Sequence, residues 1–202
     1  MLNIKIMKKI STILFVILVS YNMSSQILVS QIVPLSTHTF PENAYLKDLN
    51  NVLLPYVGTW EGILNNRKYT FVVTKFTQNY DDFGKYFKDE LMVKLQLTDM
   101  SNGVILYDNL SAITYDEYNI LGTTPHKGMF NCYFTDSEAN CKNKFEFILK
   151  NIPGNPNQKK YCYFAYHQSW NPLSNGYNCY TNIDRYSLPV YLPTEDLILT
   201  KQ

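Results

Sequence analysis

Apolar and polar residues alternate with a period of two along much of the chain, which is the pattern of β-strands. In the clearest stretch, residues 91–98, every second side chain from Leu91 to Leu97 is a leucine or valine. That spacing places the four apolar side chains on one face of a strand and leaves the other face to water. Asn102-Gly103 follows, and both residues tolerate the positive φ of a tight hairpin turn. We therefore predict a strand over 91–98 and a partner strand over 104–107.

Further strands are predicted where β-branched and aromatic residues gather between turn signals. They cover residues 58–64, 69–76, 129–134, 145–150, 161–168 and 197–200, with longer loops over 77–88, 111–127 and 169–182. About eight strands then follow one another in sequential order. Antiparallel strands joined mostly by hairpins can close into a barrel, and closure removes the exposed sheet edges. The predicted fold is an all-β antiparallel meander barrel of about eight strands.

One short helix is predicted ahead of the barrel. Between Asn43 and Tyr56 the apolar residues recur at helical spacing, Asn43 can cap the start and Pro55 ends the pattern. We expect this helix, over residues 43–54, to cover one end of the barrel, with Trp60 buried nearby.

Residues 1–25 have the pattern of a secretory signal peptide. Three lysines precede an apolar run over 10–21, which is short for a membrane span, and small residues predict cleavage before Gln26. The alternative is an uncleaved anchor helix. No cysteine lies near the cleavage region, which argues against a lipoprotein. We expect a secreted or periplasmic protein with an extended leader over 26–42 and a single barrel domain over 43–202.

Charge excludes some partners. Removing the signal takes away three lysines and no acid, which leaves 15 basic and 17 acidic side chains. A nearly neutral surface lacks the positive field that attracts nucleic acid or an anionic membrane. We expect neither partner for the mature chain, and we expect a monomer.

The chain is rich in aromatic residues, with 17 Tyr and 11 Phe. Flat rings suit a pleated, half-buried surface, so a β-core with cross-strand aromatic pairs is the plain interpretation. The functional interpretation is that the aromatic residues form a stacking surface or line an apolar ligand cavity.

All four cysteines lie in the C-terminal part of the chain, and the first of them is Cys132. An even number in an exported chain suggests disulfides. We expect the pairs Cys132–Cys141 and Cys162–Cys179, because each would close one local loop, although four cysteines allow two other pairings. Metal binding is disfavoured because no C-x-x-C or neighbouring histidine occurs.

No catalytic motif is present in the sequence. There is no G-x-S-x-G elbow, and the three histidines are far apart, with His167 expected to be an ordinary strand residue. The densest acids, Asp81-Asp82 and Asp89-Glu90, are interpreted as solvated loop charges rather than as a glycosidase pair. We therefore predict no catalytic residue, no cofactor and no metal.

The tripeptide Gly58-Thr59-Trp60, which opens the first strand after the predicted helix, resembles the start of lipocalins and other calycin-type barrels. The resemblance implies that the tryptophan packs at the closed end of the barrel, beneath an arginine from a late strand. Arg185 is the only late arginine and would take that part.

A second likeness covers nearly the whole mature chain. The segments QIVPLST, NAYLKDLNN, YVGTWEG, DELMVKLQLTD, EANC and LILTK are similar to a family of uncharacterised exported proteins of flavobacteria, known only as a domain of unknown function. This resemblance implies one exported β-domain and a bacterial source, and it implies no activity.

Two classes of function remain open. The first is an exported, non-catalytic binding module that holds a small apolar ligand or a sugar in the barrel or at its rim. The second is an exported interaction or structural protein with a filled barrel and no ligand. Cavity volume separates them, because a ligand binder needs an open cavity of a few hundred Å³.

Overall fold

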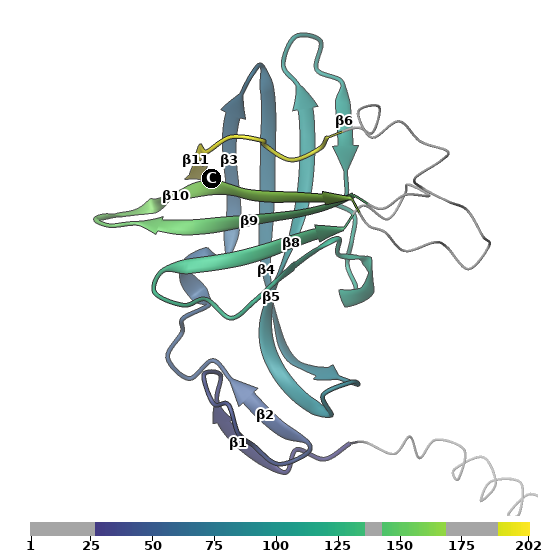
Figure 1. Ribbon diagram of the computed structural model, residues 1–202, viewed down its shortest axis with the longest axis vertical. Coiled ribbons are helices and arrows are strands. Elements are labelled where there is room, and N and C mark those ends of the chain that lie inside the picture. Colours follow the sequence, from purple (N-terminus) through teal and green to yellow (C-terminus); the bar gives the residue numbers. More distant parts are fainter. Residues whose placement is uncertain (1–26, 136–142, 169–189) are drawn as a thin grey trace, which may run out of the picture.

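The computed structural model describes residues 27–135, 143–168 and 190–202, and its regular structure is almost entirely β. Within these residues, eleven strands form one sheet (Figure 1). The strands are β1 (Gln31–Pro34), β2 (Ala44–Lys47), β3 (Gly58–Leu64), β4 (Arg67–Asp81), β5 (Tyr86–Asp99), β6 (Ile105–Asp108), β7 (Ile120–Gly122), β8 (Met129–Thr135), β9 (Asn143–Ile152), β10 (Asn155–Gln168) and β11 (Leu197–Lys201). Two 3-10 turns, η1 (Leu54–Tyr56) and η2 (Tyr115–Glu117), lie between strands.

Eight of these strands close into a barrel. Their order is β5, β4, β3, β11, β10, β9, β8 and β7, and β7 pairs back with β5. Each neighbouring pair around this ring is antiparallel. The predicted antiparallel barrel of about eight strands is therefore confirmed.

Strand β5 organises the rest of the sheet. One of its edges pairs with β4 along most of its length. Its other edge meets β2 at residues 87–88, β7 at residues 92–93 and β6 at residues 96–98. Strands β2 and β6 thus extend the sheet beyond the barrel, and β1 joins β2 in parallel. We call β1, β2 and the first residues of β5 the annex; it lies below the barrel in Figure 1.

The predicted helix over 43–54 is wrong. Its first part, Ala44–Lys47, is strand β2, which pairs in parallel with β1 and β5. Asn43 and Asn51 have φ values of 59° and 53°, which a right-handed helix does not allow. Leu49, which the helix would bury, is 53% exposed. Only the single turn η1 remains helical, and the segment expected to be a leader supplies β1.

The alternation over 91–98 is confirmed. Its four odd-numbered apolar side chains are buried in the barrel, at 1% exposure or less. The other face is not wholly wet, because Met92 is buried against Ala112 and Tyr118 on the outside of the barrel. The predicted hairpin turn is also present: Gly103 has a φ of 73°, and its N–H donates to the carbonyl of Asp99 at 2.8 Å.

Two predicted loops contain strand. In 77–88, β4 continues to Asp81 and β5 begins at Tyr86, so only residues 82–85 make the turn. In 111–127, Ile120–Gly122 forms β7, the strand that closes the barrel. The first segment is polar and the second is short, so neither carries a local strand signal. Each is a strand because it pairs with a neighbouring strand.

Aromatic side chains fill the interior of the barrel. The rings of Phe71, Phe147 and Tyr161 contact one another, with centroids 4.9–5.8 Å apart. Further buried rings are Tyr56, Trp60, Tyr69, Tyr107, Phe130, Phe134 and Phe145. The interpretation of the aromatic richness as a β-core is confirmed. Within the described part of the chain, no helix has the length and apolar character needed to cross a membrane.

Candidate functional site

Trp60 anchors one end of the barrel. It lies on β3 with no exposed surface, and its indole N–H donates to the carbonyl of Tyr56 at 2.7 Å. Tyr56 ends the turn η1, so this bond ties the chain entering the barrel to its first strand. The predicted burial of Trp60 is confirmed, although η1 rather than a helix over 43–54 covers it.

Two lysines lie over the indole of Trp60. The Nζ atom of Lys159, on β10, is 4.4 Å from the ring centroid, and that of Lys201, on β11, is 5.3 Å away. Arg185, which the lipocalin resemblance placed there, lies outside the described residues. We call Tyr56, Trp60, Lys159 and Lys201 the Trp60 end.

Gly58 makes room for this arrangement. Its φ is strongly positive, in a region that side-chain-bearing residues rarely adopt. A Cβ added at this position would clash with Cε of Lys201. The glycine in the sequence Gly58-Thr59-Trp60 therefore lets Lys201 reach across to the indole.

The cysteines do not form a site in the described residues. Cys132 is buried in the barrel, where burial raises the pKa of its thiol, and Cys162 is half-buried. Neither is bonded to another cysteine of the described residues. Their expected partners, Cys141 and Cys179, lie outside the described residues, so the two disulfide pairs stay a prediction.

The two acidic pairs differ, and Asp82 is exposed in the β4–β5 turn, as expected of a solvated loop charge. Asp81 accepts hydrogen bonds from the backbone N–H groups of residues 83 and 84 in the β4–β5 turn. The sequence predicted that Asp89 and Glu90 are solvated loop charges, and this prediction is wrong. Both residues lie on β5, and they are 3% and 7% exposed. Glu90 pairs with Lys88 at 3.0 Å.

Asp89 is the centre of a carboxylate network in the annex. Its carboxylate accepts hydrogen bonds from the Tyr45 hydroxyl and from the backbone N–H groups of Asp48 and Gln78. Lys75 lies 3.1 Å from the carboxylate of Asp48 and 3.5 Å from that of Asp89. Burial alone would raise the pKa of Asp89, but these hydrogen bonds and the lysine charge bring it below its ordinary value.

The described residues show no metal centre. His167 lies on strand β10, as expected, opposite Lys144. Nowhere in the ranges that the structure describes do three or more His, Cys, Asp or Glu side chains gather as metal ligands would.

The outer face of β8, β9 and β10 carries a cleft that the sequence did not reveal. Alternation along β8 and β9 buries one set of side chains in the barrel and turns Asn131, Tyr133, Glu146 and Ile148 outward. The pairing register places Tyr133 opposite Glu146 and Asn131 opposite Ile148. Phe164 occupies an irregularity in the pairing of β10 with β9, and its side chain is 66% exposed.

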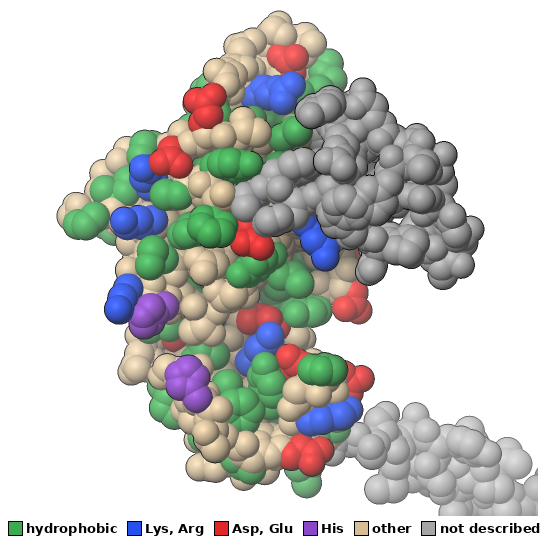
Figure 2. Space-filling model, viewed as in Figure 1, with side chains coloured by type: hydrophobic (Ala, Val, Ile, Leu, Met, Phe, Trp, Pro, Cys, Tyr) green, Lys and Arg blue, Asp and Glu red, His purple; other side chains and the backbone are tan. Residues whose placement is uncertain are grey.

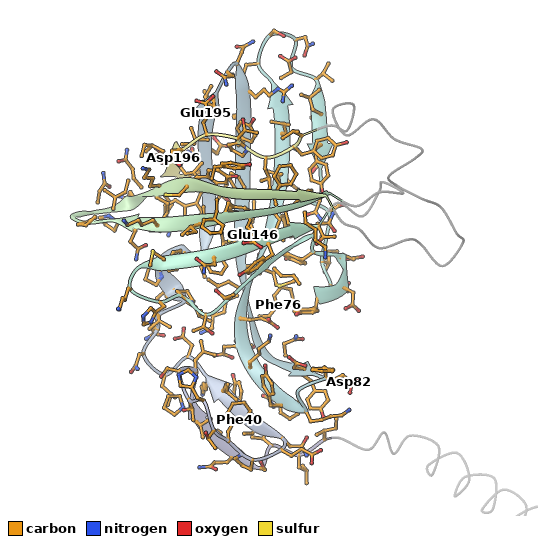
Figure 3. The ribbon with its side chains drawn as sticks, in the orientation of Figure 1. Phe40, Phe76, Asp82, Glu146, Glu195 and Asp196 are labelled. Atoms are coloured by element: carbon orange, nitrogen blue, oxygen red, sulfur yellow. The ribbon has the colours of Figure 1, made fainter. Side chains whose placement is uncertain are left out.

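These side chains border a cleft of about 280 Å³. Tyr133 is 40% exposed, so two aromatic rings face solvent within one cleft. Figure 3 labels Glu146 on this face of the barrel, and Figure 2, in the same view, shows exposed hydrophobic side chains on this side of the molecule. We call Asn131, Tyr133, Glu146, Ile148 and Phe164 the aromatic cleft.

The fold and these sites define a single antiparallel β-barrel with a filled interior. The chain matches the model of a family of unknown function, DUF6705, over residues 7–202, and it belongs to that family. No curated protein and no solved structure matches it.

Proposed function

We propose that this protein is an exported, non-catalytic binding protein that holds a carbohydrate in the aromatic cleft. The observation that carries the proposal is the pair of exposed rings, Tyr133 and Phe164, beside the carboxylate of Glu146 in one cleft. The barrel is then a scaffold, because its interior is occupied by its own aromatic side chains.

The chemistry of the aromatic cleft suits a sugar. The face of an aromatic ring is electron-rich, so it attracts the weakly positive C–H groups on the flat side of a pyranose. A sugar also needs a few polar groups around those rings to orient its hydroxyls. The Glu146 carboxylate can accept hydrogen bonds from hydroxyls, and the Asn131 amide can donate or accept.

The filled interior is the feature expected of the alternative, an interaction protein that binds another protein. Exposed aromatic residues dominate many protein interfaces. The sugar is favoured here because the exposed rings border a cleft with a carboxylate and an amide.

The test measures retention on insoluble cellulose, xylan, chitin and starch, followed by titration with soluble oligosaccharides of the polysaccharide that binds. Tyr133→Ala and Phe164→Ala should each weaken binding about ten-fold, since an aromatic contact contributes up to about 1.5 kcal/mol and about 1.4 kcal/mol is a factor of ten. Phe83→Ala is the matched control, because Phe83 is fully exposed in the β4–β5 turn, outside the cleft. Equal losses in all three variants, or no retention on any of the four polysaccharides, would rule the proposal out.

Two further measurements test the remaining parts of the proposal. Reducing ends should not accumulate when the bound polysaccharide is incubated with the protein, and their release would show an enzyme. Expression of the full chain in a secreting bacterial host should yield a protein whose N-terminal residue lies at or near Gln26, because the signal pattern ends there. An intact N-terminus retained in the cytoplasm would contradict export.

A further inference from the structure

The Trp60 end buries a positive charge that meets no acidic side chain of the described residues. Lys159 is 2% exposed, and its Nζ donates one long hydrogen bond, 3.4 Å, to the carbonyl of Pro156. Its other neighbours are ring faces: Trp60 at 4.4 Å and Tyr56 at 5.6 Å. Among the described residues, neither Lys159 nor Lys201 has an acidic side chain within ion-pair distance.

Burying the Lys159 ammonium group without an acid costs free energy unless another interaction compensates for the lost hydration. A buried ammonium group is normally paired with an acid, because removal from water disfavours its charge. Aromatic faces offset part of that penalty, but they do not neutralise the charge. Burial and the neighbouring charge of Lys201 both lower the pKa of Lys159. Two like charges thus share one indole at this end of the barrel.

A cleft of about 400 Å³ opens beside these two lysines. Lys159 and Lys201 both line it, together with the turn between β9 and β10. Pro55 and Ile152 contribute apolar surface, while Asn155 and Asn157 contribute polar groups. In Figure 1 this turn and the C-terminus of the chain lie at the same end of the barrel. The cleft is therefore separate from the aromatic cleft, which lies on the outer face of β8–β10.

We propose that this cleft binds a small organic oxyanion, whose carboxylate or phosphate group lies between Lys159 and Lys201. The anion completes the hydrogen bonding of two ammonium groups, each of which has three donors. Lys201 is exposed and contacts the anion from the solvent side, whereas Lys159 supplies charge from within the barrel end. The volume of the cleft leaves room for the organic part of the ligand.

The test uses Trp60 as its reporter. The second tryptophan, Trp170, is replaced in a Trp170→Phe background, so that indole fluorescence comes from Trp60 alone. Inorganic phosphate and citrate are titrated in turn, with glycerol as the neutral control, and isothermal calorimetry follows the same additions. At least one of the two anions should bind saturably and change the fluorescence of Trp60. The tighter of the two then identifies the charged group as phosphate or carboxylate.

Two lysine variants test whether anion binding depends on the lysines of this cleft. Lys201→Gln should weaken anion binding about ten-fold, since a hydrogen bond to a charged group contributes enough for that factor. Lys47 is an exposed lysine on β2, in the annex. The control variant Lys47→Gln removes one positive charge there and should leave anion binding unchanged. Lys201 is exposed, so its replacement leaves the folded barrel available for measurement. No binding of either anion, or equal weakening by Lys201→Gln and Lys47→Gln, would overturn the proposal. Neither result bears on the sugar, because the aromatic cleft is tested with other variants.

Discussion

Asp89 and Lys159 are both buried, but among the described residues only Asp89 has a side chain of opposite charge beside it. The carboxylate network of the annex gives Asp89 two backbone N–H groups, a hydroxyl and a lysine. The Trp60 end gives Lys159 two ring faces and one carbonyl. A fully paired buried charge has its bonding satisfied and needs no ligand. At a buried charge without a counter-ion, a ligand can supply the opposite charge and the missing hydrogen-bond acceptors.

The largest expected effect is at the anchor of the Trp60 end. Trp60→Ala should lower the free energy of unfolding by about 3–5 kcal/mol, as truncations of large buried aromatic residues do. It removes both the ring that fills the barrel end and the surface that Lys159 and Lys201 share. Urea unfolding monitored by circular dichroism checks this. An unchanged midpoint would show that Trp60 does not anchor this end.

Removing one buried charge from each region should have unequal effects on stability. Asp89→Asn should destabilise the protein by about 3 kcal/mol, because it leaves Lys75 and the surrounding donors without one carboxylate. Lys159→Met should change stability by less than about 1 kcal/mol, because the loss of the cation–π contacts is offset by relief of the buried charge. Chemical denaturation of both variants compares them directly. A larger loss for Lys159→Met than for Asp89→Asn would reverse the comparison.

Acid should weaken the annex through Asp89. The pKa of Asp89 in the folded protein is lowered from an ordinary value of about 3.9, so between these values the unfolded chain binds more protons. Stability from this group is therefore complete above about pH 4 and falls as the pH drops toward the folded pKa. Unfolding free energies at pH 7, 5, 4 and 3 should converge between the wild type and Asp89→Asn. Parallel curves would show that Asp89 is not held ionised by its partners.

The smallest predicted effect separates two buried tyrosines. The Tyr56 hydroxyl has no hydrogen-bond partner among the described residues, whereas that of Tyr161 donates to the carbonyl of Pro193 at 2.9 Å. Tyr56→Phe should therefore leave stability unchanged or raise it by about 1 kcal/mol, and Tyr161→Phe should lower it by about 1 kcal/mol. Thermal unfolding of the two variants side by side gives the sign. Equal losses would mean that the Tyr56 hydroxyl has a partner after all.

The barrel could be predicted from the sequence because its strands carry local signals. The alternation from Leu91 to Leu97 and the turn at Asn102-Gly103 both act within a few residues, and both are found as predicted. Strand β7 could not be predicted in this way. Its short segment, Ile120–Gly122, is strand because β5 and β8 lie on either side.

The prediction of a helix in the annex was wrong for a physical reason. Apolar residues over 43–54 recur at a spacing that suits a helix, but β2 is held by pairing with two other strands, and Asp48 binds the backbone N–H groups of Val52 and Leu53. Tertiary pairing therefore overrode local periodicity. The candidate sites were harder still. Lys159 and Lys201 lie far apart along the chain, and only the barrel brings both to Trp60.

The barrel is closed by two short seams, and this has a consequence for how it folds. Strand β5 meets β7 at two residue pairs, and β11 meets β3 at two, Thr200 with Glu61 and Lys201 with Trp60. The second seam joins segments that are far apart along the chain, so forming it requires closure of a very long loop, which is slow. The hairpin of β4 and β5 can form before residues 197–201 have been synthesised, but the ring cannot. Folding is therefore expected to finish at the β3–β11 seam, and the amides of β11 should exchange with solvent before those of β4 and β5.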